Sequence, residues 1–433
     1  MLRFAASPTG DMHIGNLRVA ILNYIVSKQR KEDLIVRIED TDHEKNIEGK
    51  DTEILDLLAL FGIEYSQVIY QSENVRFHSA MALQLIHEKK AFSCFCSPEW
   101  LEKKREEATE AKEEYKYDDA CRNLPAELVI DNINPFTIRI NRPDDTLLIN
   151  DHIKGNLNFE PDTVDSFIIM HQDKTPTYNF ACAVDDMLND ISIVICDEDQ
   201  INNTPKQEHI RNALSYNKKV EYAHLPVILN NAGKKMSKRD DASNVKWLLE
   251  EGYLPEAIAN YLILIGNEPC KEIFSIKDAI EWFSLEKISK SPARFDIEML
   301  KHINKEHLKS MDAKELSRYV GFADAEIGEL ARIYLEEVGT TKELKNKIAS
   351  IFAPRNIPDD LKEQTALVAK TIKNAPHFDE YDDFKNHIMK ESGLKEEKDF
   401  SRPLRILLTN AEHGPDVAKI YKYLKNYIGE IVK

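Results

Sequence analysis

Two short strings of residues, far apart in the chain, carry the chemistry that the sequence suggests. The first, S-P-T-G-D-M-H-I-G-N from Ser7 to Asn16, places a Pro-Gly turn and His13 directly before a helical pattern. A helix start offers free N–H groups and a partial positive charge, which suit phosphate. The second, K-M-S-K-R from Lys235 to Arg239, holds two lysines that can neutralise a leaving pyrophosphate. Either string alone also fits a capped helix or a solvated basic loop, but together they predict activation of a carboxylate by ATP.

The elements around the first string alternate between strand and helix. Arg3 to Ala6 is predicted as a strand, and His13 to Arg30 has apolar residues at helical spacing. Leu34 to Ile38 is a second buried strand, and residues 48–61 form a further amphipathic helix. This alternation predicts a parallel sheet with helices on its faces. Ligands gather at the carboxyl ends of such strands, where the S-P-T-G turn lies.

The middle of the chain departs from this pattern, and the last part is helical. Residues 94–180 hold a charged helical stretch from Pro98 to Lys116 and short strand-like pieces at 136–140 and 167–171, which we interpret as an inserted domain. Ile191 to Ile195 resumes a buried strand. After Lys246 nearly all of the sequence has helical patterning, punctuated by prolines.

Composition limits the classes of protein that fit. The chain has 433 residues, 42% of them hydrophobic and 31% charged, which is typical of a globular protein of about three domains. The net charge of −17 argues against indiscriminate nucleic-acid binding but leaves room for a specific RNA partner. No apolar run is long enough to span a membrane, no secretory signal is recognisable, and the six cysteines are irregularly spaced. We expect a cytoplasmic protein without disulfides.

At this point the chain resembles the class I aminoacyl-tRNA synthetases, and within them the glutamyl-tRNA synthetase family, over essentially its whole length. The strings that carry the resemblance, in order, are R-F-A-A-S-P-T-G-D-M-H-I-G-N, R-I-E-D-T-D (37–42), Y-D-D-A-C-R (117–122), P-T-Y-N-F-A-C-A-V-D-D (176–186), N-N-T-P-K-Q (202–207), K-M-S-K-R and R-F-D-I-E-M-L-K-H-I-N (294–304). The resemblance implies a ligase that activates L-glutamate with ATP and Mg²⁺ and passes the glutamyl group to the 3′ end of tRNA.

The resemblance also implies a domain order. A Rossmann-like catalytic domain would occupy residues 1–90 and 181–240, with an acceptor-stem-binding domain inserted at 91–180. A stem-contact region would follow at 241–300 and an all-α anticodon-binding domain at 301–433. The partners would be tRNA and L-glutamate, with no membrane involved, and the protein would be a monomer.

The resemblance assigns roles to individual residues. Catalysis would rest on His13, Lys235, Ser237 and Lys238, and ATP would contact Thr9, His13, Gly15, Asn16 and Lys238. Glutamate would be bound by Arg3, Ala5, Ser7, Glu39, Tyr178 and Cys196. Of these, Arg3 would grip the side-chain carboxylate, and Ser7 and Glu39 would hold the ammonium group.

Three departures from the family pattern stand out. Ala6 replaces a usual proline, which removes no chemical group. Cys196 replaces a usual arginine that faces the amino-acid carboxylate, a change shared with the glutaminyl enzymes. Cys94, Cys96 and Cys121 match a zinc site found in part of the family, but its usual histidine ligand is Asn123 here. Tyr117 could supply the fourth ligand that a structural Zn²⁺ needs, or the three thiols could be simple core residues.

The identity of the tRNA is suggested by two residues near the C-terminus. Discriminating members of the family place an arginine where Glu337 aligns and often a threonine where Gly414 aligns. An acid in place of a guanidinium removes one base contact. The chain therefore resembles the second glutamyl enzyme of ε-proteobacteria, which loads glutamate onto the glutamine tRNA for later amidation.

Other interpretations stay open on the sequence alone. The tRNA could be the glutamate isoacceptor, the glutamine isoacceptor or both, and the amino acid could be glutamine. A non-ligase nucleotidyltransferase shares both phosphate motifs, although it lacks the long helical C-terminus. An inactive RNA-binding paralogue would explain Cys196, and a truncated tRNA-modifying relative would lack the anticodon domain.

Overall fold

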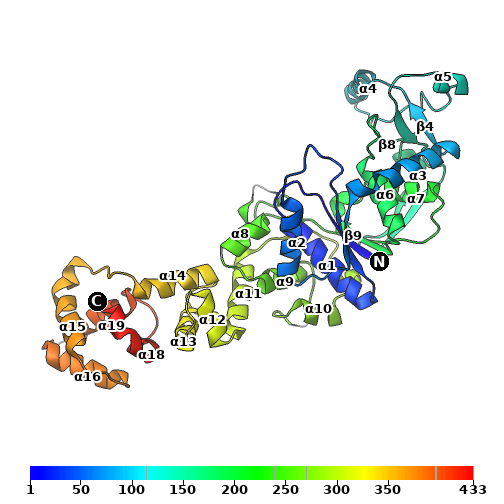
Figure 1. Ribbon diagram of the computed structural model, residues 1–433. Coiled ribbons are helices and arrows are strands. Elements are labelled where there is room, and N and C mark those ends of the chain that lie inside the picture. The colour runs from blue at the N-terminus through cyan, green and yellow to red at the C-terminus, as the bar shows by residue number, and fades with distance from the viewer. Residues whose placement is uncertain (114, 238–239, 270, 395–396, 433) are drawn as a thin grey trace. The chain divides into compact units, whose positions relative to one another are not determined.

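The computed structural model describes residues 1–433 except 114, 238–239, 270, 395–396 and 433 (Figure 1). The chain divides into two compact units. The first comprises Met1–Val245 and Leu262–Phe295, and the second comprises Lys246–Tyr261 and Asp296–Lys433. We describe each unit separately.

Two sheets form the centre of the first unit. In one, β1 (Leu2–Ala6), β2 (Leu34–Ile38) and β3 (Gln67–Tyr70) lie parallel in that order, joined by α1 (Ile14–Arg30) and α2 (Lys50–Leu60). The other has the order β7-β6-β10-β9, built from β6 (Leu147–Asp151), β7 (Gly155–Phe159), β9 (Ile193–Asp197) and β10 (Glu221–Leu225). Ser192 N–H donates to the Met1 carbonyl at 2.9 Å, so β9 starts beside β1. The predicted α/β fold class with a parallel sheet is confirmed.

A third, antiparallel sheet lies in the range predicted as the insertion. It contains β4 (Ala91–Cys94), β5 (Thr137–Ile140) and β8 (Ile168–Met170), accompanied by α3 (Val75–His87), α4 (Pro98–Glu110) and α5 (Ala126–Ile130). The β6–β7 hairpin comes from the same range of sequence but pairs with β10. The helix predicted over 98–116 ends at Glu110, because Lys112 takes the left-handed conformation with φ 58°.

The remaining elements of the first unit complete its sheets and their cover. The helices are α6 (Tyr178–Leu188), α7 (Thr204–Ala213) and α10 (Ile276–Trp282), and β11 (Ile228–Leu229) pairs with β12 (Ala293–Arg294). The core contains residues such as Ile35, Val194 and Tyr222, all nearly inaccessible to solvent. Among the described residues, no helix combines the length and apolar character that a membrane crossing requires.

The described residues of the second unit form helices joined by loops, with no strand among them. Its helices are α11 (Ile297–Ser310), α12 (Ala313–Tyr319), α13 (Ala325–Tyr334), α14 (Thr341–Phe352), α15 (Lys362–Asn374), α16 (Tyr381–Ser392), α17 (Glu397–Thr409), α18 (Val417–Leu424) and α19 (Ile428–Ile431). Two more helices, α8 (Val245–Glu250) and α9 (Pro255–Leu264), run across the boundaries between the units. This agrees with the helical C-terminal region that the sequence predicts.

Candidate active site

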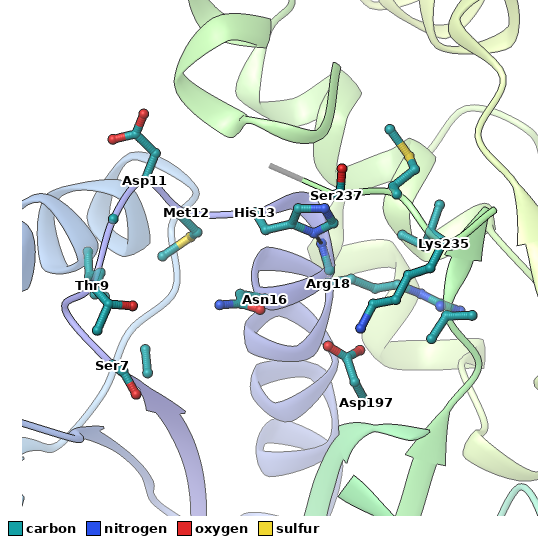
Figure 2. Close-up of a pocket in the computed structure, with 17 residues that line it drawn as sticks. Ser7, Thr9, Asp11, Met12, His13, Asn16, Arg18, Asp197, Lys235 and Ser237 are labelled. Atoms are coloured by element: carbon teal, nitrogen blue, oxygen red, sulfur yellow. Dashed lines mark hydrogen bonds between the residues drawn. The ribbon is translucent and has the colours of Figure 1, made fainter. Parts of the chain in front are cut away.

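The two predicted phosphate motifs meet at one cavity of about 390 Å³, at the carboxyl end of β1 and the start of α1 (Figure 2). The residues that line it are Ala6, Ser7, Thr9, Gly10, Asp11, Met12, His13, Gly15, Asn16, Arg18, Ile54, Asp197, Val227, Ile228, Lys235, Met236 and Ser237. All the described residues that the sequence assigned to ATP or to catalysis are therefore in one place. A helix N-terminus beside a lysine is suited to a polyphosphate.

His13 caps α1 and has a defined orientation. Its Nδ1 accepts a hydrogen bond from Gly15 N–H at 3.0 Å, so the neutral ring carries its proton on Nε2. Gly15 needs to be small, since a Cβ there would lie 3.1 Å from His13 Nδ1 and 3.6 Å from the Asp197 carboxylate. The first turn of α1 therefore offers a close backbone approach and one ring donor.

The second motif is held near the cavity by neighbouring acids. Lys235 Nζ pairs with the Asp199 carboxylate. Ser237 donates to Asp240 through its backbone N–H at 2.9 Å and its hydroxyl at 3.2 Å. Lys238 and Arg239 lie outside the described residues, so the predicted role of Lys238 stays a prediction.

A larger groove of about 1490 Å³ adjoins this cavity. Ser7, Thr9, Glu39 and Tyr178 line it, which are residues predicted for glutamate and ATP. Ser7 and Thr9 line both cavities. The Tyr178 hydroxyl donates to Gln200 at 3.3 Å, and its side chain is exposed toward the groove rather than packed in the core.

Arg3 is buried in an ion-pair network that includes Glu39 of this groove. Its Nε donates to Asp186 Oδ1 at 3.1 Å, and Arg37 Nη1 donates to the same oxygen at 2.5 Å. Arg37 Nη2 continues the network to Glu39 Oε1 at 3.1 Å. Burial alone would raise the pKa of Asp186, but the charges of Arg3, Arg37 and Arg211 outweigh this effect and lower the pKa to about 2. The carboxylate is therefore ionised at neutral pH and fixes both arginines.

Two thiols lie close to this network. Cys196 is in β9 opposite His224 of β10, and burial raises the pKa of Cys196 to about 12, so it is a neutral thiol. Cys182 donates to Glu39 Oε1 at 3.2 Å. Ala5, also predicted to contact glutamate, is in β1 opposite Arg37. With a thiol at position 196, Arg3 and Arg37 are the cations that the described residues pair directly with Asp186 and Glu39.

The neighbouring acid, Asp185, faces a different set of side chains. It accepts hydrogen bonds from the amides of Gln71 and Asn74, and its Oδ1 lies 2.9 Å from His78 Nε2. Those three residues belong to the segment that leads into and forms the start of α3. Of these two adjacent acids of α6, Asp186 thus holds the arginines of the first sheet, and Asp185 holds the segment 71–78.

The sequence also matches a family model, described as "tRNA synthetases class I (E and Q), catalytic domain", over residues 1–302. The chain belongs to this family of class I tRNA synthetases. This membership, together with the glutamate–tRNA ligases described next, confirms the predicted enzyme class, an ATP-dependent glutamate–tRNA ligase, in place of a non-ligase nucleotidyltransferase.

Full-length relatives within the synthetase family agree. The chain is 72% identical over 433 residues to glutamate–tRNA ligase 2 of Sulfurimonas denitrificans, and 54% identical over 433 residues to glutamate–tRNA ligase 1 of a Nitratiruptor species, with 100% of each chain covered. A crystal structure of a glutamate tRNA ligase from Elizabethkingia meningosepticum, in complex with its amino acid, superposes with a TM-score of 0.85 at 26% identity. That match covers 100% of this chain and 98% of the other.

The thiols predicted as a zinc site of the synthetase do come together. The sulfur atoms of Cys94, Cys96 and Cys121 lie within 4.8 Å of one another. The Tyr117 hydroxyl is 3.4 Å from the sulfurs of Cys94 and Cys96. Arg139 donates from Nε to Cys94 Sγ at 3.4 Å and stacks over the Tyr117 ring at 3.8 Å. The group has three sulfurs, one phenol and one nearby cation.

The two residues predicted to select the tRNA are neighbours in the second unit. A Cβ at Gly414 would lie 3.4 Å from Glu337 Oε1, although the two residues are far apart in sequence. Glu337 pairs with Lys347 at 2.8 Å, and Arg405 donates to the carbonyl of Gly414 at 3.3 Å.

The sequence analysis did not single out several residues that line the smaller cavity or form the ion-pair network, namely Arg37, Asp186, Cys182, Arg18 and Asp197. One signal was visible: Arg37 interrupts an otherwise apolar strand, and two aspartates end an apolar helical run. Charges buried in such positions need partners. Which partners they have depends on pairing between distant elements.

Proposed function

We propose that this chain activates L-glutamate with Mg-ATP and then charges mainly the glutamine tRNA, producing glutamyl-tRNA for later amidation. In the first step the α-carboxylate of glutamate attacks the α-phosphate of ATP in line and displaces pyrophosphate. Catalysis of such a step rests on positioning and on stabilising charge. In the second step a ribose hydroxyl of the terminal adenosine of the tRNA attacks the acyl carbonyl of the glutamyl-adenylate, and AMP leaves.

The geometry around Arg3 supports a role in binding the side-chain carboxylate of glutamate. Asp186 engages only its Nε, and none of the described residues accepts a hydrogen bond from its Nη1 or Nη2. Two parallel N–H donors match a carboxylate. Ser7 and Glu39 would hold the ammonium group, with Tyr178 as one wall and Ala5 and Cys196 beside the network.

The start of α1 supports the assignment of ATP to the smaller cavity. His13 would donate from Nε2 to a phosphate oxygen, with Thr9, Gly15 and Asn16 along the triphosphate and the ribose. Lys235 and Lys238 would neutralise the pyrophosphate as it leaves, and Ser237 would fix the loop that carries them. Mg²⁺ would arrive as part of the substrate complex.

The observation that carries the tRNA assignment is the position of the Glu337 carboxylate beside Gly414, where a Cβ would lie 3.4 Å from Glu337 Oε1. A glycine here leaves the Glu337 carboxylate accessible from the side of residue 414, where a larger residue would crowd it. A carboxylate accepts hydrogen bonds from the amino groups of bases and repels phosphate. Arginine instead donates hydrogen bonds to acceptor atoms of bases and attracts phosphate. We infer that this pair sets which anticodon is admitted.

Charging measured separately with purified glutamate and glutamine tRNAs tests this assignment. We expect the wild type to prefer the glutamine tRNA and Glu337→Arg to raise charging of the glutamate tRNA at least about tenfold, the loss or gain of one good base contact. Glu336→Arg is the control, because it makes the same change of charge at an exposed neighbour that pairs with Lys305. Equal use of both tRNAs by the wild type, or no gain with Glu337→Arg, would contradict the assignment.

We also propose that Cys94, Cys96 and Cys121 bind one structural Zn²⁺, with Tyr117 as the fourth ligand. Sulfurs bound tetrahedrally at about 2.3 Å are about 3.8 Å apart, and Cys96 Sγ lies 3.6 Å from Cys121 Sγ. Elemental analysis of the purified protein should find about one zinc per chain. Cys121→Ser should lose most of it, whereas the control Cys196→Ser should keep it.

The domain roles and the assembly complete the proposal. Residues 91–180 would bind the acceptor stem, 241–300 would contact the stem further along, and 301–433 would bind the anticodon. The enzyme would work as a monomer in the cytoplasm. Sedimentation equilibrium at micromolar concentration should return the mass of one chain. The mass of a dimer would contradict the proposed monomer.

A further inference from the structure

Asp197 is a carboxylate inside the nucleotide cavity that no step above uses. It ends β9 and lines the 390 Å³ cavity together with Gly15 and Lys235. Figure 2 shows its carboxylate pointing toward α1, on the opposite side of that helix from Asn16 in this view. Among the residues that the structure describes, none donates a hydrogen bond to this carboxylate. It therefore has acceptor capacity directed at whatever occupies the cavity.

The groups around Asp197 define which part of a nucleotide it can meet. On one side, its Oδ2 lies 3.6 Å from the position of a Cβ at Gly15, next to the helix start that suits phosphate. On the other side, β10 pairs Leu225 with Asp197 and leads directly to Val227 and Ile228, two apolar residues of the cavity wall. An apolar wall suits the face of a base. Asp197 thus lies between a phosphate end and a base end.

The charge of the Asp197 carboxylate decides which part of a nucleotide it can bind. Phosphate oxygens carry negative charge, so a carboxylate repels them. The ribose joins phosphate to base, and its hydroxyls are neutral donors that a carboxylate can accept. Acids at the carboxyl ends of parallel strands bind ribose hydroxyls in the same way in dinucleotide folds. Burial raises the pKa of Asp197, while the charges of Arg18 and Lys235 favour its ionised form.

We propose that Asp197 accepts a hydrogen bond from a ribose hydroxyl of ATP and makes the enzyme select ribonucleotides over deoxyribonucleotides. The inference rests on the proposed placement of ATP in the smaller cavity. Asp197 is a binding residue that contributes specificity, while His13 and Lys235 interact with the phosphates.

Calorimetric titration of the full chain with ATP, 2′-deoxy-ATP and 3′-deoxy-ATP tests the proposal. A hydrogen bond to a charged acceptor should make the wild type bind ATP about tenfold to a hundredfold more tightly than the analogue that lacks the contacted hydroxyl. Asp197→Ala should bind ATP as weakly as the wild type binds that analogue and should no longer distinguish the two. Asp197→Asn, which keeps an acceptor oxygen and the shape, should retain a reduced preference.

The control is Asp199→Asn, which removes a carboxylate two residues away that pairs with Lys235. It should keep the full preference for ATP over both analogues, because it changes the charge near the lysine without touching the ribose. Equal binding of all three nucleotides by the wild type would overturn the role of Asp197 while leaving the ATP site in place. Failure of the wild type to bind ATP at all would overturn the site itself. An Asp197 variant with altered Mg²⁺ dependence and an unchanged ribose preference would also overturn the proposal.

Discussion

Replacing Asp186 by asparagine tests the ion-pair network that joins Arg3, Arg37 and Glu39. The amide keeps the shape but removes the charge that Arg3 and Arg37 share. The lowering of the Asp186 pKa from 3.8 to about 2 corresponds to about 2 kcal/mol of stabilisation. Removing one partner from buried charges costs more, since the arginines lose their counter-ion, and we expect a loss of about 3–5 kcal/mol of unfolding free energy at pH 7.

The dependence on pH follows from the direction of the shift. The pKa of Asp186 is lower in the folded protein than in the unfolded chain, so its stabilisation is complete above about pH 4 and is lost as pH falls toward 2. The difference in unfolding free energy between wild type and Asp186→Asn should therefore be constant between about pH 5 and about pH 8. It should shrink in acid.

Urea unfolding followed by circular dichroism measures these differences. Asp190→Asn is the control, because Asp190 pairs with Lys218 at the surface, where solvent screens the ion pair and its loss should have little effect. A loss below about 1 kcal/mol for Asp186→Asn at pH 7, or a difference that grows in acid, would refute the reasoning.

Three further substitutions address close packing. At Gly328 a Cβ would lie 1.7 Å from the Ala313 carbonyl oxygen, so Gly328→Ala should separate α12 from α13 and cost about 3 kcal/mol. Gly429→Ala, where nothing lies within 4 Å, should be neutral or slightly stabilising in the same unfolding assay. Gly15→Ala should push against His13 and raise the KM for ATP about tenfold, or about 1.4 kcal/mol, while the KM for glutamate stays within about twofold. An unchanged KM for ATP would count against the placement of the nucleotide.

The sequence predicted local elements well and long-range partners poorly. Leu34–Ile38 is a strand over the range predicted, because five consecutive buried residues give a clear pattern. The strand predicted at 191–195 is shifted to Ile193–Asp197, which places Cys196 and Asp197 within it. Hydrophobicity cannot reveal that the β6–β7 hairpin joins β10, because that pairing depends on an element far along the chain.

The same division holds for the active site. His13, Gly15 and Lys235 were found because short motifs carry them, and the structure brings them to one cavity. Arg37 and Asp186 were not found, because their function depends on a contact between β2 and α6. Motifs single out residues that carry reactive or charged groups, whereas the residues that hold them in place become visible only in three dimensions.

The adjacent aspartates of α6 restrict how this enzyme can vary during evolution. Asp185 and Asp186 point to different partners from consecutive positions, so the register of α6 satisfies both at once. A one-residue insertion or deletion before them would rotate both by about 100° and detach both sets of partners. Insertions should accumulate in the loops around α5, whereas the spacing between the start of α6 and Asp186 should tolerate none.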